Sequence, residues 1–487
     1  MRKFKLNYLF ILILVIVLGT TVISMEVKAE EAVSLPVNVT ISNGSDASVI
    51  RDGSYKTSVY LQNGDTITVK SDTPISGMYL IWDAPVAEWT LKYNDKEITQ
   101  GTNGFLHDYI TFEGVVTEFS ICTAKSNRLA DIYCYGAGDL PADVQVWEPM
   151  CEKADILLYS THADDEILFF GSILPEYAME RDLEVQVVYF SQYWTGAKIR
   201  EHEKLDGLWH AGVRNYPYNA DFDDLYSTSF EQACNIFGYE KALDFTVGVI
   251  RKFKPQVVIA QDLNGEYGHG THMFTAKITT EAIMMTNDAS KYPESAQLYG
   301  THEVKKTYLH LYGENKIKLP TRVPLDSFGG KTALEVAQES YKYHVSQQWC
   351  WFYVDDEYEY SCADFGLFHS TVGLDTGNDI MENIVDYKTQ KAEEEEKLRQ
   401  EEESRRQEEE SKRQEAESIS EAESIKESQS IAAEESKQET EKKEAQERKL
   451  VTTLIVVAIS ITVVAIVIII ILKNIQSKKR RKKRRVK

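Results

Sequence analysis

The chain has 487 residues, a formal net charge of −22 and an apolar fraction of 43%. This length predicts more than one domain, and the apolar fraction is close to that of globular proteins, so sizeable cores can form. Nucleic acid is excluded as an expected partner, because proteins that bind phosphate backbones present a basic surface.

The first 29 residues have the pattern of a secretory signal peptide. A basic start, MRKFK, is followed by the apolar run YLFILILVIVLGTTV, and residues 27–29 read VKA, which is typical of a cleavage site. The apolar run is shorter than the roughly 20 residues that a membrane-spanning helix needs. We therefore expect residues 1–29 to be removed on export, with an uncleaved anchor as the alternative.

Residues 33–136 form short runs in which apolar and polar side chains alternate, with turn residues between the runs. The stretch KTSVYLQNGDTITVKSD, for example, has the pattern of strand, turn and strand. Several short strands at this spacing predict an antiparallel β-sandwich, followed by a linker over residues 137–150. Trp82 and Trp89 could contact sugars in a carbohydrate-binding domain, although aromatic residues of this kind more often pack in a core.

Residues 151–387 show a different pattern, in which continuous apolar runs alternate with helical segments. ADILLYS and LEVQVVYFS read as buried strands, and the segment between them has helical spacing. The runs FTVGVIRKFK, PQVVIAQ and THMFTAKITTEAIMM repeat this order. Strand, helix and strand in succession predict a Rossmann-like α/β domain with a parallel sheet.

The remainder of the chain is first strongly charged and then apolar. Residues 388–449 contain no glycine, proline or aromatic residue and too few apolar ones for a heptad seam, which favours either a solvated helical stalk or a disordered spacer. Residues 450–472 carry no charge and predict one transmembrane helix. Residues 473–487 contain ten Lys and Arg residues, which is typical of a cytoplasmic tail that follows a transmembrane helix. The membrane is therefore an expected partner.

The six cysteines do not suggest a metal site, because no two of them have C-x-x-C spacing. Disulfides are permitted in an exported protein. Cys122 with Cys134, and Cys350 with Cys362, are close enough in sequence to be candidate pairs.

The stretch STHADDE, at residues 160–166, places an imidazole and three carboxylates directly after a predicted buried strand. Ligands of parallel α/β sheets bind at the carboxyl ends of strands, and charged groups beside apolar runs need a balancing partner. A divalent metal would supply one, with a third ligand from His269 or His272, which follow another predicted strand. Capping of the following helix by Asp164 and Asp165 is the alternative.

Three motifs together resemble the PIG-L/LmbE-like family of metal-dependent N-acetylglucosaminyl deacetylases. They are HADDE, the R-x-x-E that starts at Arg200, and YGHGTH, and the resemblance covers residues 154–274. Ala163 stands where the family motif HPDDE has a proline, which shapes the turn and carries no chemistry. Thr271 stands where the family commonly has Asp or Asn, which leaves a supporting contact in doubt and no ligand.

The resemblance implies a Zn²⁺ ion, or another divalent metal, held by His162, Asp165 and His272. It implies that Asp164 is the general base that activates water. It further implies that His269 protonates the leaving amine or stabilises the oxyanion.

Four more residues complete the expected site. Tyr267 matches a tyrosine of some family members that contacts the tetrahedral intermediate. Arg200 and Glu203 match the family's Arg-x-x-Glu helix as substrate-binding or scaffold residues, with an ordinary ion pair on one helix face as the alternative. Trp194 follows a predicted strand and is expected to line the sugar pocket, with a simple packing role as the alternative.

Other polar residues receive no catalytic role. Glu166 is expected to be an acidic residue in the first turn of a helix. His302, His310, His344 and His369 have no motif partner and are left unassigned.

The sequence therefore predicts a bacterial, single-pass cell-membrane protein with an outward-facing zinc-dependent deacetylase domain. Its substrate would be an N-acetylglucosamine-type sugar or a cell-surface glycan. Two alternatives remain: a catalytically inactive surface glycan-binding protein, and a hydrolase of a non-sugar amide.

Overall fold

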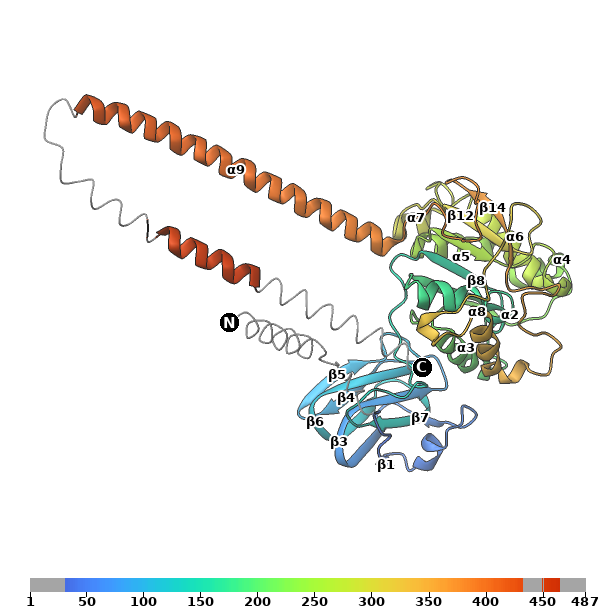
Figure 1. The fold of residues 1–487 in the computed structure, drawn as a ribbon. Helices are drawn as coiled ribbons and strands as arrows, with labels where there is room; N and C mark the ends of the chain where they lie inside the picture. The colour runs from blue at the N-terminus through green and yellow to red at the C-terminus, as the bar shows by residue number, and fades with distance from the viewer. Residues whose placement is uncertain (1–30, 432–448, 450, 465–487) are drawn as a thin grey trace, which may run out of the picture.

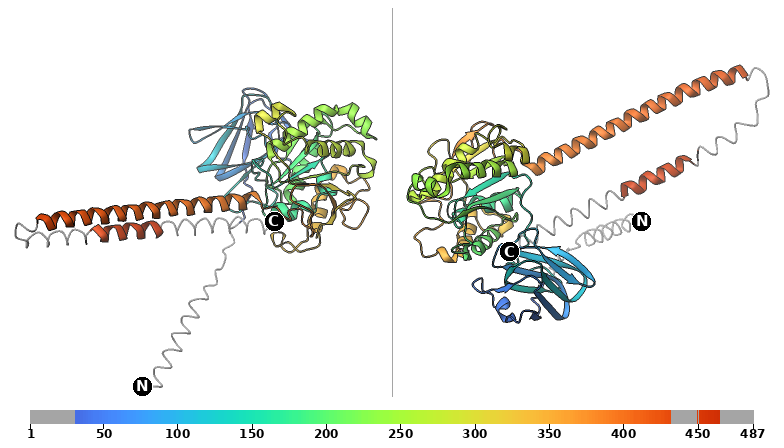
Figure 2. Two further views of the ribbon diagram at one scale, coloured as in Figure 1. Left: turned by 90° about the horizontal axis from the view of Figure 1, so that it is seen from above. Right: turned by 180° about the vertical axis from the view of Figure 1, so that it is seen from behind.

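The computed structural model describes residues 31–431, 449 and 451–464, and it contains two sheets of seven strands each (Figure 1). The first sheet is N-terminal, and the second belongs to an α/β unit. A 45-residue helix, α9 (Tyr387–Ile431), projects from the α/β unit in every view (Figure 2).

The N-terminal unit is a single antiparallel sheet, so the expected β-sandwich is wrong. Its order is β2-β7-β3-β6-β4-β5, and β1 pairs with β3. β3 and β6 run for 17 residues each, and shifts of register around Ile75 interrupt their pairing. β3 and β6 therefore contribute to the sheet on both sides of this interruption. Alternation of apolar and polar residues predicts strands, but it does not show which neighbouring runs belong to one long strand. The strands are β1 (Asn38–Ile41), β2 (Val59–Leu61), β3 (Thr66–Trp82), β4 (Trp89–Tyr93), β5 (Lys96–Gln100), β6 (His107–Thr123) and β7 (Asn127–Tyr135).

Trp82 and Trp89 belong to the core of this sheet rather than to its surface. Their exposed fractions are 0% and 1%, and their ring centroids lie 5.7 Å apart. Neither residue can therefore contact a sugar from this position.

The sheet of the α/β unit is mixed, which corrects the expectation of a parallel sheet. Its order is β10-β9-β8-β11-β12-β14-β13. The first five strands are parallel, whereas β14 is antiparallel to both β12 and β13. β13 has only three residues, and β14 follows the long loop after α8 rather than the helix directly. Antiparallel edge strands of this kind are common on otherwise parallel sheets. The strands are β8 (Ile156–Ser160), β9 (Val185–Gln192), β10 (Tyr218–Asp223), β11 (Val257–Ala260), β12 (Lys306–His310), β13 (Lys316–Lys318) and β14 (Asp364–Ser370).

Helices cover both faces of this sheet, because successive strand side chains point to opposite faces. Ile156 and Leu158 of β8 belong to one core cluster, and Leu157 and Tyr159 belong to another. The first cluster includes residues of α2, α3 and α8, and the second includes residues of α4, α5 and α6. The helices are α2 (Asp165–Leu168), α3 (Ile199–His210), α4 (Phe230–Phe237), α5 (Tyr239–Phe253), α6 (Gly270–Ala282), α7 (Pro293–Tyr299) and α8 (Ala333–Ser340).

A buried polar contact joins the N-terminal sheet to helix α3. The Nε2 atom of His107 on β6 lies 2.9 Å from Nδ1 of His202 on α3. Tyr55 donates a hydrogen bond of 3.2 Å to Asp206 on the same helix, and Gln145 donates one of 2.6 Å to the same oxygen. Helix α3 therefore packs against both units (Figure 1).

All six cysteines are free, so the two candidate disulfides are wrong. Cys122 on β6 pairs in register with Thr66 of β3, whereas Cys134 on β7 pairs with Met78 of the same strand. The two thiols therefore lie on strands that flank β3, far apart along its length.

The predicted ends of the chain fall largely outside the described residues. Among residues 31–431, 449 and 451–464, no helix has both the length and the apolarity to cross a membrane. The expected transmembrane helix over 450–472 is therefore not found there, and residues 450 and 465–472 lie outside the description. So do the signal peptide (1–29) and the basic tail (473–487). Of the predicted stalk, residues 388–431 are helical, as part of α9.

Candidate active site

The residues of the HADDE and YGHGTH motifs meet where the central strands of the mixed sheet end. β8 lies between β9 and β11 in the sheet. The chain runs from β8 through β9 to β10 on one side of β8, and then returns to β11 on the other side. His162 follows β8, and His269 follows β11. Ligands of α/β sheets bind at such a switch point, and both motifs reach it from carboxyl ends of strands.

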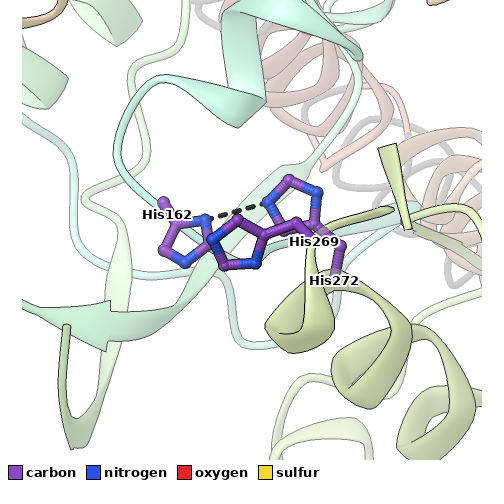
Figure 3. A group of neighbouring side chains, drawn as sticks. All are labelled: His162, His269 and His272. Atoms are coloured by element: carbon purple, nitrogen blue, oxygen red, sulfur yellow. Dashed lines mark hydrogen bonds between the residues drawn. The ribbon is translucent and has the colours of Figure 1, made fainter. Parts of the chain in front are cut away.

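Three buried ligand-type atoms form a close triangle at this point. The Nδ1 atom of His162 lies 2.9 Å from Nε2 of His272 (Figure 3). The Oδ2 atom of Asp165 lies 3.0 Å from the first nitrogen and 3.1 Å from the second. A triangle of this size allows each corner to lie about 2.0–2.2 Å from one Zn²⁺ ion, the distance of its imidazole and carboxylate ligands. The two-histidine, one-carboxylate set that we predicted therefore fits a zinc ion.

His269 gives the cluster a third imidazole, but it lies further out. Its ring centroid is 4.8 Å from that of His162 and 4.6 Å from that of His272 (Figure 3). The three histidines can offer nitrogens within 4.8 Å of one another, so a three-histidine set is geometrically possible. Asp165 completes the tighter set, since its oxygen is within 3.1 Å of both nitrogens.

The charges of this cluster support one another in the buried site. Burial opposes ionisation of Asp165, yet His272 and His162 hold the pKa of its carboxyl well below the usual value. Burial also opposes a charge on His272, but Asp165 and Glu266 raise the pKa of its imidazole to about 10. A carboxylate that is buried beside two imidazoles is thus stabilised in the ionised form that binds metal.

Asp164 lies in a strained turn beside the triangle. Its backbone φ is 139°, which is rare for a residue with a side chain, and its N–H donates a 2.7 Å hydrogen bond to Glu166. Burial raises the pKa of the Asp164 carboxyl to about 6, although the nearby Arg200 lowers it. A carboxylate with such a pKa is suited to accept a proton near neutral pH. Strain of this kind is concentrated at functional sites.

Arg200 and Glu203 do not pair with each other. An Nη2 hydrogen of Arg200 is donated to Asp164 Oδ1 over 2.8 Å, and the same group also contacts the Ala163 carbonyl. Glu203 accepts hydrogen bonds of 2.7 and 2.5 Å from the backbone and hydroxyl of Ser346. Arg200 thus holds the turn that carries the predicted base, and Glu203 holds a neighbouring loop.

The structure leaves Trp194 half-buried at the end of β9. Its side chain packs against the core cluster on the α3 side of the sheet, and its backbone N–H donates a 2.8 Å hydrogen bond to Gln192. A role for Trp194 in lining the sugar pocket remains a prediction.

His269 begins helix α6, and its hydrogen bond fixes the tautomer of the ring. The Nδ1 atom accepts a hydrogen bond of 3.2 Å from the backbone N–H of Thr271. The proton of a neutral ring is then on Nε2, which can donate. Burial and the neighbouring His162 and His272 lower the pKa of His269, so the neutral ring is favoured. Thr271 binds Ser227 over 2.8 Å and places no carboxylate behind His269.

Tyr267 lies at the mouth of the site with an exposed fraction of 38%. Its backbone is in the left-handed region, with φ of 47°. The ring centroid is 5.6 Å from that of His269 and 5.4 Å from that of His272. The tyrosine is therefore close to both histidines, where the resemblance placed it.

Two buried carboxylates were missed as parts of the site. Glu266 accepts hydrogen bonds of 2.7 Å from His272 Nδ1 and from His310 Nδ1, and it fixes the ring of a predicted ligand. Glu166 lies in the first turn of α2, as expected, but it is fully buried and its carboxylate lies 2.8 Å from Nε2 of His344. His310 ends strand β12, so the strand-end rule that located His162 could have located it as well.

Asp224 also belongs to the site, and the sequence analysis did not include it. It follows β10 and lies 3.7 Å from His162 Nε2 and 3.4 Å from Arg200 Nη1. Its side chain is 30% exposed, so it lines the open side of the cluster. Its position at the end of a strand was the only sequence signal, and β10 had not been predicted as a strand.

An α/β fold with two histidines and a carboxylate at its switch point has the ligand set of a metal-binding α/β protein. Residues 157–283 match the family model described as "PIG-L: GlcNAc-PI de-N-acetylase". This segment is a PIG-L domain, as the motifs indicated.

Similar proteins match parts of this chain. A 1D-myo-inositol 2-acetamido-2-deoxy-alpha-D-glucopyranoside deacetylase of Rhodococcus erythropolis is 28% identical over 171 residues, which are 30% of this chain and 58% of that protein. A mycothiol S-conjugate amidase of Streptomyces coelicolor is 47% identical over 62 residues, or 13% and 20% of the two chains. The chain thus spans little more than half of the first relative.

Among solved structures, N,N'-diacetylchitobiose deacetylase from Pyrococcus horikoshii aligns with a TM-score of 0.33 and 17% identity. The alignment covers 40% of this chain and 71% of that one.

Proposed function

We propose that the protein is a metal-dependent hydrolase that removes the acetyl group from an N-acetylated amino sugar. The observation that carries this proposal is the buried triangle of His162, Asp165 and His272, with Asp164 held beside it by Arg200. The match of residues 157–283 to a de-N-acetylase family supports the same reaction.

The triangle would hold Zn²⁺, or another divalent metal, through His162 Nδ1, Asp165 Oδ2 and His272 Nε2. When bound, such an ion lowers the pKa of water and polarises an amide carbonyl. Asp164 accepts the proton of the attacking water, because its carboxylate is next to the triangle and is oriented by Arg200. The same carboxyl group can then return a proton to the leaving amine.

His269 and Tyr267 would bind the oxygen that gains charge during attack. The Nε2–H of the neutral His269 is free of the Thr271 contact and can donate a hydrogen bond to that oxygen. The Tyr267 hydroxyl can donate a second one from the mouth of the site. This assignment gives His269 the role of oxyanion donor rather than that of proton donor to the amine.

The protein is further proposed to act outside the cytoplasm on a surface glycan. The basic and apolar pattern of residues 1–29 supports export.

A non-sugar amide remains the second candidate substrate, because one similar protein is named an amidase. A binding protein without activity is disfavoured, since Asp164 and the ligand triangle are all present in close contact.

The test is acetate release by the full chain from N-acetylglucosamine and from chitooligosaccharides, with added zinc and with a chelator. An Asp164→Asn variant should bind zinc in the wild-type amount but release no acetate. Asp221→Asn, at an exposed aspartate of β10, is the matched control and should retain activity. Release that persists in the chelator, or in Asp164→Asn, would show that the proposed base and metal are not used.

A further inference from the structure

A group of large aromatic side chains lies exposed on the loop between helix α8 and strand β14. Trp349 and Trp351 have exposed fractions of 81% and 59%, and Phe352 beside them is half-buried. We call these three residues the aromatic rim. Soluble proteins rarely leave several large aromatic side chains together in solvent unless the surface binds something.

The aromatic rim is continuous with the candidate active site. The ring centroids of Trp351 and Phe352 lie 4.1 Å apart, and those of Phe352 and Tyr267 lie 4.4 Å apart. Tyr267 in turn lies 5.4 Å from His272, a predicted metal ligand. A row of rings therefore leads from solvent to the ligand triangle.

The loop that carries the rim is held at several points by groups of the α/β unit. Glu203 binds Ser346 on one side of the rim, and His310 Nε2 lies 2.9 Å from the Ser361 carbonyl on the other. Arg322 donates a 2.9 Å hydrogen bond to Asp356 between these points. A surface that is fixed in this way loses little conformational entropy when a ligand binds.

The loop is also acidic. Residues 343–363 contain Asp355, Asp356, Glu357 and Glu359 and no lysine or arginine. Glu357 and Glu359 are exposed, and Glu357 also lies 3.5 Å from the guanidinium of Arg322. An anionic lipid surface would be repelled by this charge, whereas a ligand with amino groups would be attracted.

We propose that the aromatic rim binds the sugar units next to the one that is deacetylated, so that the substrate is an oligomeric amino-sugar glycan. Sugar rings present apolar C–H faces that suit indole rings. Units that have already lost an acetyl group carry ammonium ions, which aromatic faces and the carboxylates of Glu357 and Glu359 attract. This inference rests on the proposed deacetylase function, and it names the class of its substrate.

The test compares chitopentaose with N-acetylglucosamine as substrates of the full, zinc-loaded chain. The wild type should have the higher kcat/KM for the pentamer. The double variant Trp349→Ala/Trp351→Ala should lose about tenfold in kcat/KM for the pentamer while its value for the monomer changes less than twofold. Tyr60→Ala, which removes an exposed aromatic ring of the N-terminal sheet, is the control and should change neither value.

The charged part of the proposal is tested with the glucosamine pentamer as an inhibitor. Glu357→Gln/Glu359→Gln should weaken its inhibition several-fold, and the difference should shrink in high salt because exposed charges are screened. Equal inhibition of the two proteins would overturn the role of the carboxylates.

Failure of this inference can be told apart from failure of the proposed function. If the monomer is deacetylated but the tryptophan variant loses nothing for the pentamer, or loses equally for both substrates, the rim is not a subsite. If neither sugar is deacetylated but the pentamer still quenches tryptophan fluorescence in the wild type and not in the double variant, the subsite stands and the deacetylase function fails.

Discussion

The Oε2 atom of Glu266 lies 2.7 Å from the Nδ1 atom of His272 at the buried base of the site. This contact directs the other nitrogen of the ring toward His162 and Asp165. Burial alone would raise the pKa of Glu266, but hydrogen bonds from His272 and His310 lower it to about 2, so the carboxylate stays ionised. Carboxylates behind ligand histidines orient the ring and increase its basicity.

Replacing Glu266 by Gln should therefore weaken zinc binding by about 10- to 100-fold. Competition with a chromophoric chelator measures this change directly, without reference to activity. Glu303→Gln, at an exposed glutamate, is the control and should bind zinc like the wild type. Unchanged affinity in Glu266→Gln would mean that this contact does not support the metal site.

The pH dependence of the reaction should change when Arg200 is replaced by Gln. Asp164 accepts a proton only when ionised, and burial raises its pKa to about 6 while Arg200 lowers it. Without the guanidinium the pKa of Asp164 rises further, so the acidic limb of kcat/KM moves to higher pH, by about one unit or more. Arg128→Gln, on the N-terminal sheet, should leave the profile in place. A limb that stays put, or moves down, would argue against Asp164 as the base.

The role of His269 can be decided with two substitutions. His269→Ala removes the Nε2–H donor and should lower kcat by about 100- to 1,000-fold, as the loss of an oxyanion donor does. His269→Gln keeps an N–H donor but cannot protonate an amine, so it should recover part of the lost rate. Measured kcat values that are equally low for both variants would instead support the role of proton donor.

The contact between His107 and His202 should make stability depend on pH. Burial lowers the pKa of His202 to about 3, so the folded protein leaves it neutral while the unfolded chain protonates it below about 6.5. The unfolded state then binds more protons, and the free energy of unfolding falls as pH falls from about 6.5 toward 3. Asp206 acts in the opposite sense, because burial raises its pKa to about 7.

His202→Gln removes the contribution of His202 to this dependence, whereas burial still lowers the pKa of His107 in the variant. Urea denaturation at pH 7.5 and pH 5 should show a smaller loss of stability for the variant than for the wild type. An equal loss in the two proteins would place the pH sensitivity elsewhere. His369→Gln, on β14 and outside this interface, is a suitable control.

The location of the site was predictable from the sequence, because the carboxyl ends of parallel strands meet at one edge. That rule placed His162 near His269 or His272. The structure brings His162 within 2.9 Å of His272, although 110 residues separate the two. It did not give the buried supports, since Glu266 and Glu166 look like ordinary acids until their partners His310 and His344 are placed. Those pairs join residues 44 or more positions apart, and only the tertiary fold aligns them.

The fold was predictable in its parts but not in its sheets. Alternating runs identified strands such as β3 and β6, yet their length makes one sheet of what we expected to be two. β14 joins the α/β sheet in the antiparallel direction because it follows the loop of the aromatic rim rather than a crossover helix. Local patterns carry no information on such long-range pairing.

The buried contact between His107 and His202 makes the N-terminal sheet and the α/β unit depend on each other in evolution. A substitution at one position leaves an unsatisfied imidazole at the other, which costs about 1–3 kcal/mol. Among proteins that contain both units, positions 107 and 202 should therefore vary together. Proteins that contain the α/β unit alone have no reason to keep a histidine at the position of His202, and a polar, solvated residue should replace it.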